Sequence, residues 1–264
     1  PDHQDRHPDP NAYFRLKTRM FDAMSGTDTA IVPANLSDRV RNATTGRPRW
    51  LSFGDTPAAD VHYAAGYVQS ADERARIDLR DTFLANTVLG PSAAAAAAAL
   101  QACGCEPAGL VPAARGFEPL PHRMQTVATI DGVVYVDDSK ATNLAAMQAA
   151  LQMASGPVRL IAGGLLKEGN LDSVKESLVK RCAAVYLIGK ASNALGKAWQ
   201  TAVTCRDCGT LEGALHAAAR DAVAGETVLL SPGCASFDQF RNYADRGNVF
   251  SDLVKALTQH AEEA

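Results

Sequence analysis

The sequence predicts an α/β protein whose second half forms a parallel sheet covered by helices on both faces. Three short apolar runs in that half alternate with stretches of helical periodicity, at 158–162, 184–188 and 227–230. Strands buried on both faces are apolar throughout, and the helices between them supply the crossovers that parallel strands need. With 47% hydrophobic and 21% charged residues in 264, the chain has the composition of a globular protein with a substantial core.

The composition argues against several classes of partner. The net charge is −3, so no basic field favours nucleic acid or anionic lipid. No apolar run approaches the roughly 18 residues that a membrane span needs. We therefore expect a cytoplasmic protein that binds neither nucleic acid nor membrane. We also expect it to be a monomer. The first ten residues, PDHQDRHPDP, include no initiator Met and no apolar signal segment, which predicts a fragment whose front is missing.

In the first half of the chain, the sequence predicts one helix, a β-rich region and a second helix. Helical periodicity covers about residues 11–24, and strands are expected at 30–33, 50–53, 61–63 and 75–79. Pro91 and Ser92 then open a helix that contains seven consecutive alanines, Ala93 to Ala99. Alanine is the best helix former, so this run needs no special function.

A domain boundary is expected between Gly104 and Pro121, where proline and glycine are dense. Beyond it, Thr126 to Asp137 predicts a hairpin that turns at Asp131-Gly132, a favoured pair for a type I′ turn. A helix is expected to follow over residues 144–153.

Polar residues directly follow three of the predicted strands. Ligands of parallel sheets bind at the carboxyl ends of the strands, so these residues are expected to share one rim. Lysines, hydroxyls and close-approach glycines in such a place favour an anionic ligand. Each residue alone is equally well explained as a helix cap or a solvated lysine. The three clusters are Asp137, Asp138, Ser139, Lys140, Thr142 and Asn143; Gly163, Gly164, Lys167 and Glu168; and Ser231, Pro232, Gly233, Cys234, Ala235, Ser236, Asp238 and Gln239.

Two common nucleotide motifs are missing from the sequence. No G-x-G-x-x-G follows a predicted strand, which argues against a dinucleotide oxidoreductase, and no G-x-x-x-x-G-K-[ST] occurs. The main phosphate cradle for any bound nucleotide is therefore not in these residues. Cys205 and Cys208 have CxxC spacing, which suits a zinc half-site or a redox pair, but no second pair has a matching gap. Reduced thiols are the favoured interpretation.

Several motifs, in this order, resemble those of the Mur ligase family, and within it the glutamate-adding ligases. The resemblance extends over almost the whole chain. Taken alone, the front motif and Lys17 would be better explained as a polar loop that enters a helix at Asn11. The motifs are Asp2-His3-x-Asp5-Arg6-His7, Lys17, Leu120-Pro-His-Arg123, Asp138-Ser-Lys-Ala-Thr-Asn143, Gly163-Gly164 with Lys167, Ser231-Pro-x-Cys-Ala-Ser-x-Asp-Gln-Phe240 and Arg246-Gly-Asn-x-Phe250.

The resemblance implies a domain organisation and an activity. Residues 1–117 would be the last part of a central ATP-binding domain, and residues 118–264 a Rossmann-like C-terminal domain that binds glutamate. The N-terminal domain and the P-loop would be missing, so this fragment alone is expected to be inactive. The parent would use ATP and Mg²⁺ to join glutamate to UDP-N-acetylmuramoyl-L-alanine in peptidoglycan synthesis, through an acyl phosphate.

The resemblance also implies roles for individual residues. Asp138 and Lys140 would face ATP and act in catalysis. His122 and Arg123 would contact the nucleotide. Glutamate would be held by Thr142, Lys167, Ser236 and Tyr243, and magnesium by a catalytic His3 and a carbamylated Lys17.

The chain departs from the family pattern in three places. Residues 86–92 align with the family's G-x-H-N-x-x-N, but the usual histidine and the asparagine that contacts adenine are replaced. Leu165 and Leu166 follow the double glycine where Asp is usual, and Tyr243 replaces phenylalanine. These departures predict that L-glutamate is tolerated as well as, or in place of, D-glutamate. A non-catalytic binding subunit of an amidotransferase remains the alternative. The retained Lys17, Lys140 and Lys167 and the lack of a four-cysteine zinc insert favour an enzyme.

Overall fold

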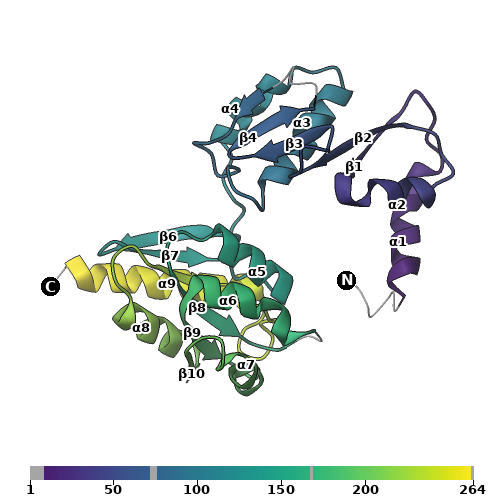
Figure 1. The fold of residues 1–264 in the computed structure, drawn as a ribbon. Coiled ribbons are helices and arrows are strands. Elements are labelled where there is room, and N and C mark those ends of the chain that lie inside the picture. Colours follow the sequence, from purple (N-terminus) through teal and green to yellow (C-terminus); the bar gives the residue numbers. More distant parts are fainter. Residues whose placement is uncertain (1–8, 72–75, 167–168, 263–264) are drawn as a thin grey trace. The chain divides into compact units, whose positions relative to one another are not determined.

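The computed structural model describes residues 9–71, 76–166 and 169–262, and the chain divides into two compact units (Figure 1). The first unit is Pro1–Glu118 and the second is Pro119–Ala264. Each unit has its own mixed sheet and its own hydrophobic core, so the predicted α/β class is confirmed.

The sheet of the first unit has five strands in the order β1-β2-β3-β4-β5. The first three strands pair in parallel and the last two pairings are antiparallel. The hairpin β3–β4 turns at Ala65-Gly66, which both have positive φ. This pair is a weak turn signal, so the sequence does not predict β4. The strands are β1 (Thr29–Pro33), β2 (Arg49–Gly54), β3 (Val61–Ala64), β4 (Tyr67–Ser70) and β5 (Arg76–Asp78).

The alanine-rich helix α3 (Gly90–Ala102) packs on this sheet. Its buried face is Ala93, Ala94, Ala97 and Ala98, and these small side chains join the core of Val61, Tyr63 and Leu79. Asn86 fixes where the helix begins, because its Oδ1 accepts from the backbone N–H groups of Val88 and Leu89. The alanine run therefore has a packing role.

The start of the chain forms α1 (Pro10–Thr18), a 3₁₀ turn (Arg19–Phe21), a second 3₁₀ turn (Ala34–Leu36) and α2 (Ser37–Asn42). Asp9 caps α1 by accepting from Asn11 N–H at 2.9 Å. The α-helix ends at Thr18, before the predicted limit near Met24. No helix among the described residues is long and apolar enough to cross a membrane.

The proline- and glycine-rich segment before the second unit is partly helical. A 3₁₀ turn (Pro107–Gly109) and α4 (Leu110–Arg115) lie within it, and Ala114 is buried in the core of the first unit. The ring of Phe117 stacks on Phe83 with centroids 6.0 Å apart. Residues up to Phe117 are therefore anchored to the first unit, and the division falls after Glu118.

The sheet of the second unit has six strands in the order β10-β9-β8-β11-β7-β6. All neighbours are parallel except the hairpin β6–β7, which adds an antiparallel edge. Asp131 and Gly132 have φ of 49° and 76°, as the predicted type I′ turn requires. The strands are β6 (Gln125–Ile130), β7 (Val133–Asp137), β8 (Val158–Gly163), β9 (Cys182–Ile188), β10 (Cys205–Gly209) and β11 (Thr227–Leu230).

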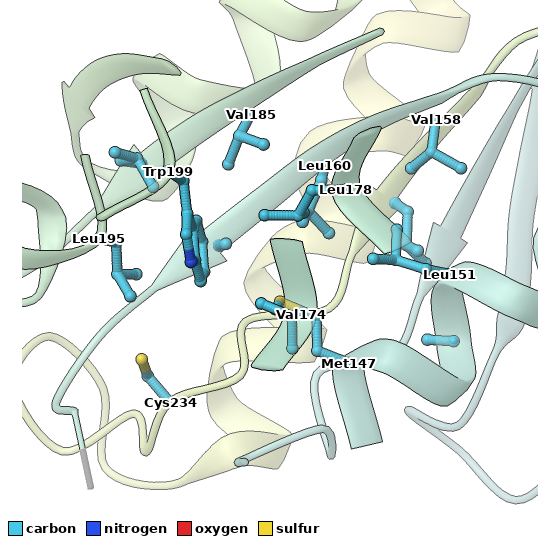
Figure 2. Close-up of a cluster of buried hydrophobic side chains, with 14 of the residues drawn as sticks. Met147, Leu151, Val158, Leu160, Val174, Leu178, Val185, Leu195, Trp199 and Cys234 are labelled. Atoms are coloured by element: carbon cyan, nitrogen blue, oxygen red, sulfur yellow. The ribbon is translucent and has the colours of Figure 1, made fainter. Parts of the chain in front are cut away.

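Helices cover both faces of this sheet, as the sequence predicts. One face packs against α5 (Leu144–Met153), α6 (Lys175–Arg181) and α7 (Ser192–Trp199); Figure 2 shows Trp199, Leu178 and Met147 in this cluster. A 3₁₀ turn (Leu171–Val174) precedes α6. The other face packs against α8 (Leu211–Asp221) and α9 (Tyr243–Glu262). The sheet is thus buried on both sides, which leaves its strand ends as the places for polar chemistry.

The CxxC pair lies on β10, an edge strand that the sequence analysis did not predict. Cys205 packs against the core on the α5–α7 face, and Cys208 packs against the core on the α8–α9 face. Burial raises the pKa of both thiols. Side chains that point to opposite faces of one sheet do not hold the same metal ion. The two cysteines therefore pack in the hydrophobic cores, one on each face of the sheet.

Candidate active site

Three neighbouring strands of the second unit end in loops that contain the predicted polar clusters. The strands β8, β11 and β7 are adjacent in the sheet and parallel, so their carboxyl ends lie along one edge. Backbone hydrogen bonds join the loops: Gly163 N–H donates to Pro232 O at 2.9 Å, and Gly233 N–H donates to Ala141 O at 2.9 Å. The loops therefore form one connected surface.

The first contact at this edge joins His122 to the end of β7. The Nδ1 atom of His122 lies 2.7 Å from Oδ2 of Asp137, whose side chain is fully buried. The other carboxylate oxygen of Asp137, Oδ1, accepts from Ser139 N–H at 2.9 Å. His122 O also accepts from Lys140 N–H at 3.1 Å. The loop before β6 is thereby fixed to the turn after β7.

Asp138 is a second buried carboxyl of the site, next to Asp137. Its Oδ2 accepts from Ser231 Oγ at 2.8 Å, and its Oδ1 accepts from Met124 N–H at 3.2 Å. Burial raises the pKa of this carboxyl to about 7, although both hydrogen bonds and the nearby charge of Arg123 act in the opposite direction. A carboxyl that titrates near neutral pH at a strand end is typical of functional sites.

Lys140 directs its ammonium group to Tyr243, the first residue of α9. The Nζ atom lies 3.3 Å from the Tyr243 hydroxyl and 5.0 Å from the ring centroid. The rings of His122 and Tyr243 meet edge to face, with centroids 6.2 Å apart. The lysine is therefore held over an aromatic surface at the same edge as Asp138.

The first turn of α9 presents one face to the site. Tyr243, Arg246 and Gly247 lie at i, i+3 and i+4, which places them on the same side of the helix. Asn242 caps this turn, because its Oδ1 accepts from Asp245 N–H at 2.9 Å. A Cβ on Gly247 would lie only 2.2 Å from His122 Nδ1, so this position has no room for a side chain.

Arg246 is fully buried below the same edge. Its Nε donates to Ser139 Oγ at 2.9 Å, and its Nη1 and Nη2 each donate to Cys234 O at 3.2 Å. Ser139 Oγ in turn donates to Tyr243 O at 2.7 Å. Burial lowers the pKa of the guanidinium to about 10 and raises that of the Cys234 thiol to about 11.

The loop after β11 brings Ser236 to the site. Ser236 is buried, and the neighbouring Ala235 exchanges backbone hydrogen bonds with Leu165 in an isolated antiparallel bridge. Gly163 and Gly164 both have φ of 129°, and a Cβ on Gly164 would lie 2.4 Å from Ala235 O. The double glycine thus allows the loops after β8 and β11 to approach closely.

The structure brings most of the predicted site residues to one unit. His122, Arg123, Asp138, Lys140, Thr142, Ser236 and Tyr243 all belong to the second unit, where Arg123 is exposed and Thr142 is half-buried. Asn143, next to Thr142, caps α5 by accepting from Ala146 N–H. Lys17 lies in the first unit, exposed on α1 with its Nζ 5.4 Å from the Tyr13 ring centroid. His3 and Lys167 lie outside the described residues.

Sequence reasoning missed two features of the site. The pairing of His122 with Asp137 joins residues that are 15 positions apart, and their identities alone do not predict the contact. In the sequence, Arg246 stands out only as part of the Arg246-Gly-Asn-x-Phe250 motif. An arginine next to a glycine in the first turn of a helix could have drawn attention to this position. The burial of Arg246, which gives it its role, is not visible in the sequence.

This edge has the chemistry of an anion-binding site that also contains an acid. Lys140, His122 and Arg123 provide cationic or donor groups, and Ser236 and Tyr243 provide hydroxyls. Such donors suit phosphate and carboxylate groups.

Comparison with known proteins agrees with this arrangement. Residues 122–234 match the family model described as "Mur ligase, glutamate ligase domain". The UDP-N-acetylmuramoylalanine–D-glutamate ligase of Myxococcus xanthus is 38% identical over 266 residues, covering 97% of this chain and 58% of that protein. The corresponding ligase of Dechloromonas aromatica is 38% identical over 263 residues, covering 97% and 57%. The chain thus spans a little over half the length of these curated relatives.

Solved structures share the fold at lower sequence identity. MurF from Acinetobacter baumannii has a TM-score of 0.69 at 15% identity, over 96% of this chain and 57% of that one. The MurF ligase of Thermotoga maritima in complex with ADP has a TM-score of 0.64 at 15% identity, over 99% and 60%. The fold agrees with Mur ligase central and C-terminal domains, and the sequence likeness is to glutamate ligases. The chain belongs to the Mur ligase family.

Proposed function

We propose that the polypeptide containing this chain is an ATP-dependent ligase of peptidoglycan synthesis that joins glutamate to UDP-N-acetylmuramoyl-L-alanine. One observation supports this above all others: likeness to curated D-glutamate ligases extends over 97% of the chain. The strand-end cluster of the second unit is compatible with that chemistry, because it combines cations, hydroxyls and a buried carboxyl. Residues 1–117 would belong to the central ATP-binding domain and residues 118–264 to the glutamate-binding domain.

The residues of the second unit suit two anionic ligands. Lys140, Arg123 and His122 are proposed to contact ATP phosphates. ATP, when bound, supplies the phosphoryl group that activates the muramoyl-alanine carboxylate. Thr142, Ser236 and Tyr243, with Lys167 from outside the described residues, are proposed to hold glutamate carboxylates. A fixed cation near developing negative charge stabilises a phosphoryl-transfer transition state.

The role proposed for Asp138 follows from its surroundings. Ser231 and Met124 hold its carboxyl in a fixed orientation, and its pKa of about 7 lets it exist in both protonation states near neutral pH. A group with these properties can accept or return a proton during ligation.

We also propose that the polypeptide binds magnesium, and this proposal depends on the family resemblance alone. His3 and a carbamylated Lys17 are the proposed ligands. Among the described residues, no group of three His, Cys, Asp or Glu side chains is placed to hold a metal ion. Without upstream residues that complete the ATP site, this chain alone is proposed to be inactive.

D-glutamate is the proposed substrate, since the relatives from both organisms are D-glutamate ligases by name. Tolerance of L-glutamate is a second proposal, supported by Tyr243. Its hydroxyl lies 3.3 Å from Lys140 Nζ, which gives the site a polar group that a phenylalanine would lack.

The test is phosphate release by the complete polypeptide with ATP, Mg²⁺, UDP-N-acetylmuramoyl-L-alanine and each glutamate enantiomer. Release that requires glutamate and yields the muramoyl dipeptide supports the ligase. Binding of these ligands without turnover would instead support the non-catalytic subunit.

A further inference from the structure

Arg246 joins two loops that belong to different halves of the proposed site. It makes two hydrogen bonds to Ser139, through Nε to Oγ at 2.9 Å and through Nη2 to O at 2.8 Å. It makes two more to Cys234 O, both at 3.2 Å. Its side chain has no exposed surface, so water does not compete for these bonds.

The two loops contain residues that would contact different substrates, although Thr142, at the end of the first loop, is proposed to contact glutamate as Ser236 does. Ser139 lies between Asp138 and Lys140 in the turn after β7. Cys234 lies two residues before Ser236 in the loop after β11. A guanidinium group is planar and has donors in fixed directions, so it sets both the spacing and the orientation of the acceptors that it joins. One side chain therefore fixes the phosphate-side turn relative to the glutamate-side loop.

The charge of Arg246 has no hydrogen-bonded carboxylate partner among the described residues, although Asp238 and Asp137 lie near enough to favour it electrostatically. Its hydrogen bonds go to carbonyl and hydroxyl oxygens. Removing a cation from water is costly, and an apolar side chain of similar volume often fills such a position at lower cost. Gly164 also passes close by, since a Cβ there would lie 3.3 Å from Nη1. The buried cation thus lies beneath all three strand-end loops.

We propose that Arg246 is a positioning residue for ligation, which holds the turn containing Lys140 at the separation from Ser236 that the reaction requires. This inference rests on the proposed function. Each loop keeps its own ligand-contacting groups when Arg246 is changed, so substrate binding should weaken little. The relative placement of the two substrates should be lost, and a displacement of about 1 Å can reduce the rate about 10²-fold.

The first test compares Arg246→Lys with the unchanged complete polypeptide. Lysine retains the charge but cannot join Ser139 and Cys234 in the same geometry. We expect kcat to fall about 10²-fold, while KM for ATP and for glutamate changes less than about threefold. The matched control is Arg241→Lys, on an arginine just before the same helix whose side chain is 86% exposed and pairs with Asp245. The control should behave as the unchanged enzyme.

The outcomes separate this inference from the proposed function. An unchanged polypeptide that forms no muramoyl dipeptide would contradict the proposed function. An active enzyme whose Arg246→Lys variant keeps kcat within about twofold would overturn the positioning role. A variant that raises both KM values strongly, with kcat unchanged, would also overturn it, because that pattern describes lost binding.

Rescue of activity by added guanidinium distinguishes a positioning role of Arg246 from a merely structural one. Arg246→Ala should regain activity when millimolar guanidinium is added, and should not respond to urea, which is similar in shape but neutral. No response of the folded variant to guanidinium, or equal rescue by urea, would overturn the inference. If Arg246→Ala does not fold, Ser139→Ala replaces it: loss of one acceptor should lower kcat about tenfold. An unchanged kcat in Ser139→Ala would then count against the proposal.

Discussion

The Nδ1 atom of His122 lies 2.7 Å from Oδ2 of Asp137, and the side chain of Asp137 is fully buried. His122 has φ of 64°, a left-handed conformation that a non-glycine residue adopts at a cost. Its N–H donates to Gln125 Oε1, and its carbonyl accepts from Lys140 N–H. These contacts hold a strained loop against the end of β7, which places Arg123 near Asp138.

Gly247 is predicted to be essential for this arrangement. An added Cβ would lie 2.2 Å from His122 Nδ1 and 2.7 Å from Asp137 Oδ2. Gly247→Ala should therefore lower the free energy of unfolding by about 1–3 kcal/mol, because neighbouring groups must shift. Urea unfolding followed by the fluorescence of buried Trp199, in a Trp50→Phe background, measures the change.

The control for Gly247 is another helical glycine of the same unit. A Cβ on Gly196 in α7 would meet only the end of the Leu187 side chain, at 3.3 Å. Gly196→Ala should be neutral or slightly stabilising, since alanine is the better helix former. If both variants unfold at the same urea concentration as the unchanged protein, the close approach at Gly247 is wrong.

Asp138 should give the second unit a distinctive pH dependence. Burial raises the pKa of its carboxyl from 3.8 to about 7 in the folded state. Between these values the folded state binds more protons than the unfolded state, so its stabilising contribution is present below about pH 4 and is lost as pH rises through 7. Asp138→Asn removes the titration. The difference in unfolding free energy, unchanged protein minus variant, should fall between pH 4 and 7; parallel pH curves would contradict this.

Relative movement of the two units is predicted to centre on residues 118–121. The preceding segment is anchored, because Phe117 stacks on Phe83 and Ala114 is buried in the first unit. Closure around ATP and UDP-N-acetylmuramoyl-L-alanine should reduce the radius of gyration of the complete polypeptide. Small-angle scattering with and without saturating ligands measures this, and an unchanged radius would count against closure.

The enantiomer preference should depend on Tyr243. We expect D-glutamate to be the preferred substrate and L-glutamate to be accepted, because the Tyr243 hydroxyl can hydrogen-bond to a ligand group oriented either way. Tyr243→Phe removes that hydroxyl and should change the ratio of kcat/KM for the two enantiomers by roughly 10-fold, the effect of about one hydrogen bond. Strict D-glutamate dependence in both proteins would show that the hydroxyl is not used.

Much of the second unit could be predicted from the sequence because its signals are local. The bounds of α5 and β11 match the predicted ranges, and Asp131-Gly132 forms the predicted turn. Apolar runs of strand length and a turn pair that tolerates positive φ are sufficient for such elements. The strand-end position of the polar clusters followed from the parallel topology alone.

Other features depend on contacts between distant residues and could not be predicted. The strand β10 is short, polar and at the sheet edge, so Cys205-Arg-Asp-Cys-Gly209 has no strand-like alternation. Arg246 and Ser139 are 107 positions apart, and they meet only because α9 packs on one face of the sheet with its first turn at the strand ends. The way in which the loops of the site are held together is therefore a property of the fold, while its residue types are visible in the sequence.

The most direct test is ligation by the complete polypeptide with Lys140 intact or changed to alanine. Muramoyl dipeptide is measured with ATP, Mg²⁺, UDP-N-acetylmuramoyl-L-alanine and D-glutamate. We predict ATP- and glutamate-dependent product, reduced about 10²-fold or more in Lys140→Ala because a cation is lost from the strand-end site. Lys180→Ala, on an exposed lysine that pairs with Glu176, should leave the rate unchanged. Absence of product from the folded, unchanged polypeptide, or an equal rate in Lys140→Ala, would contradict the proposed ligase.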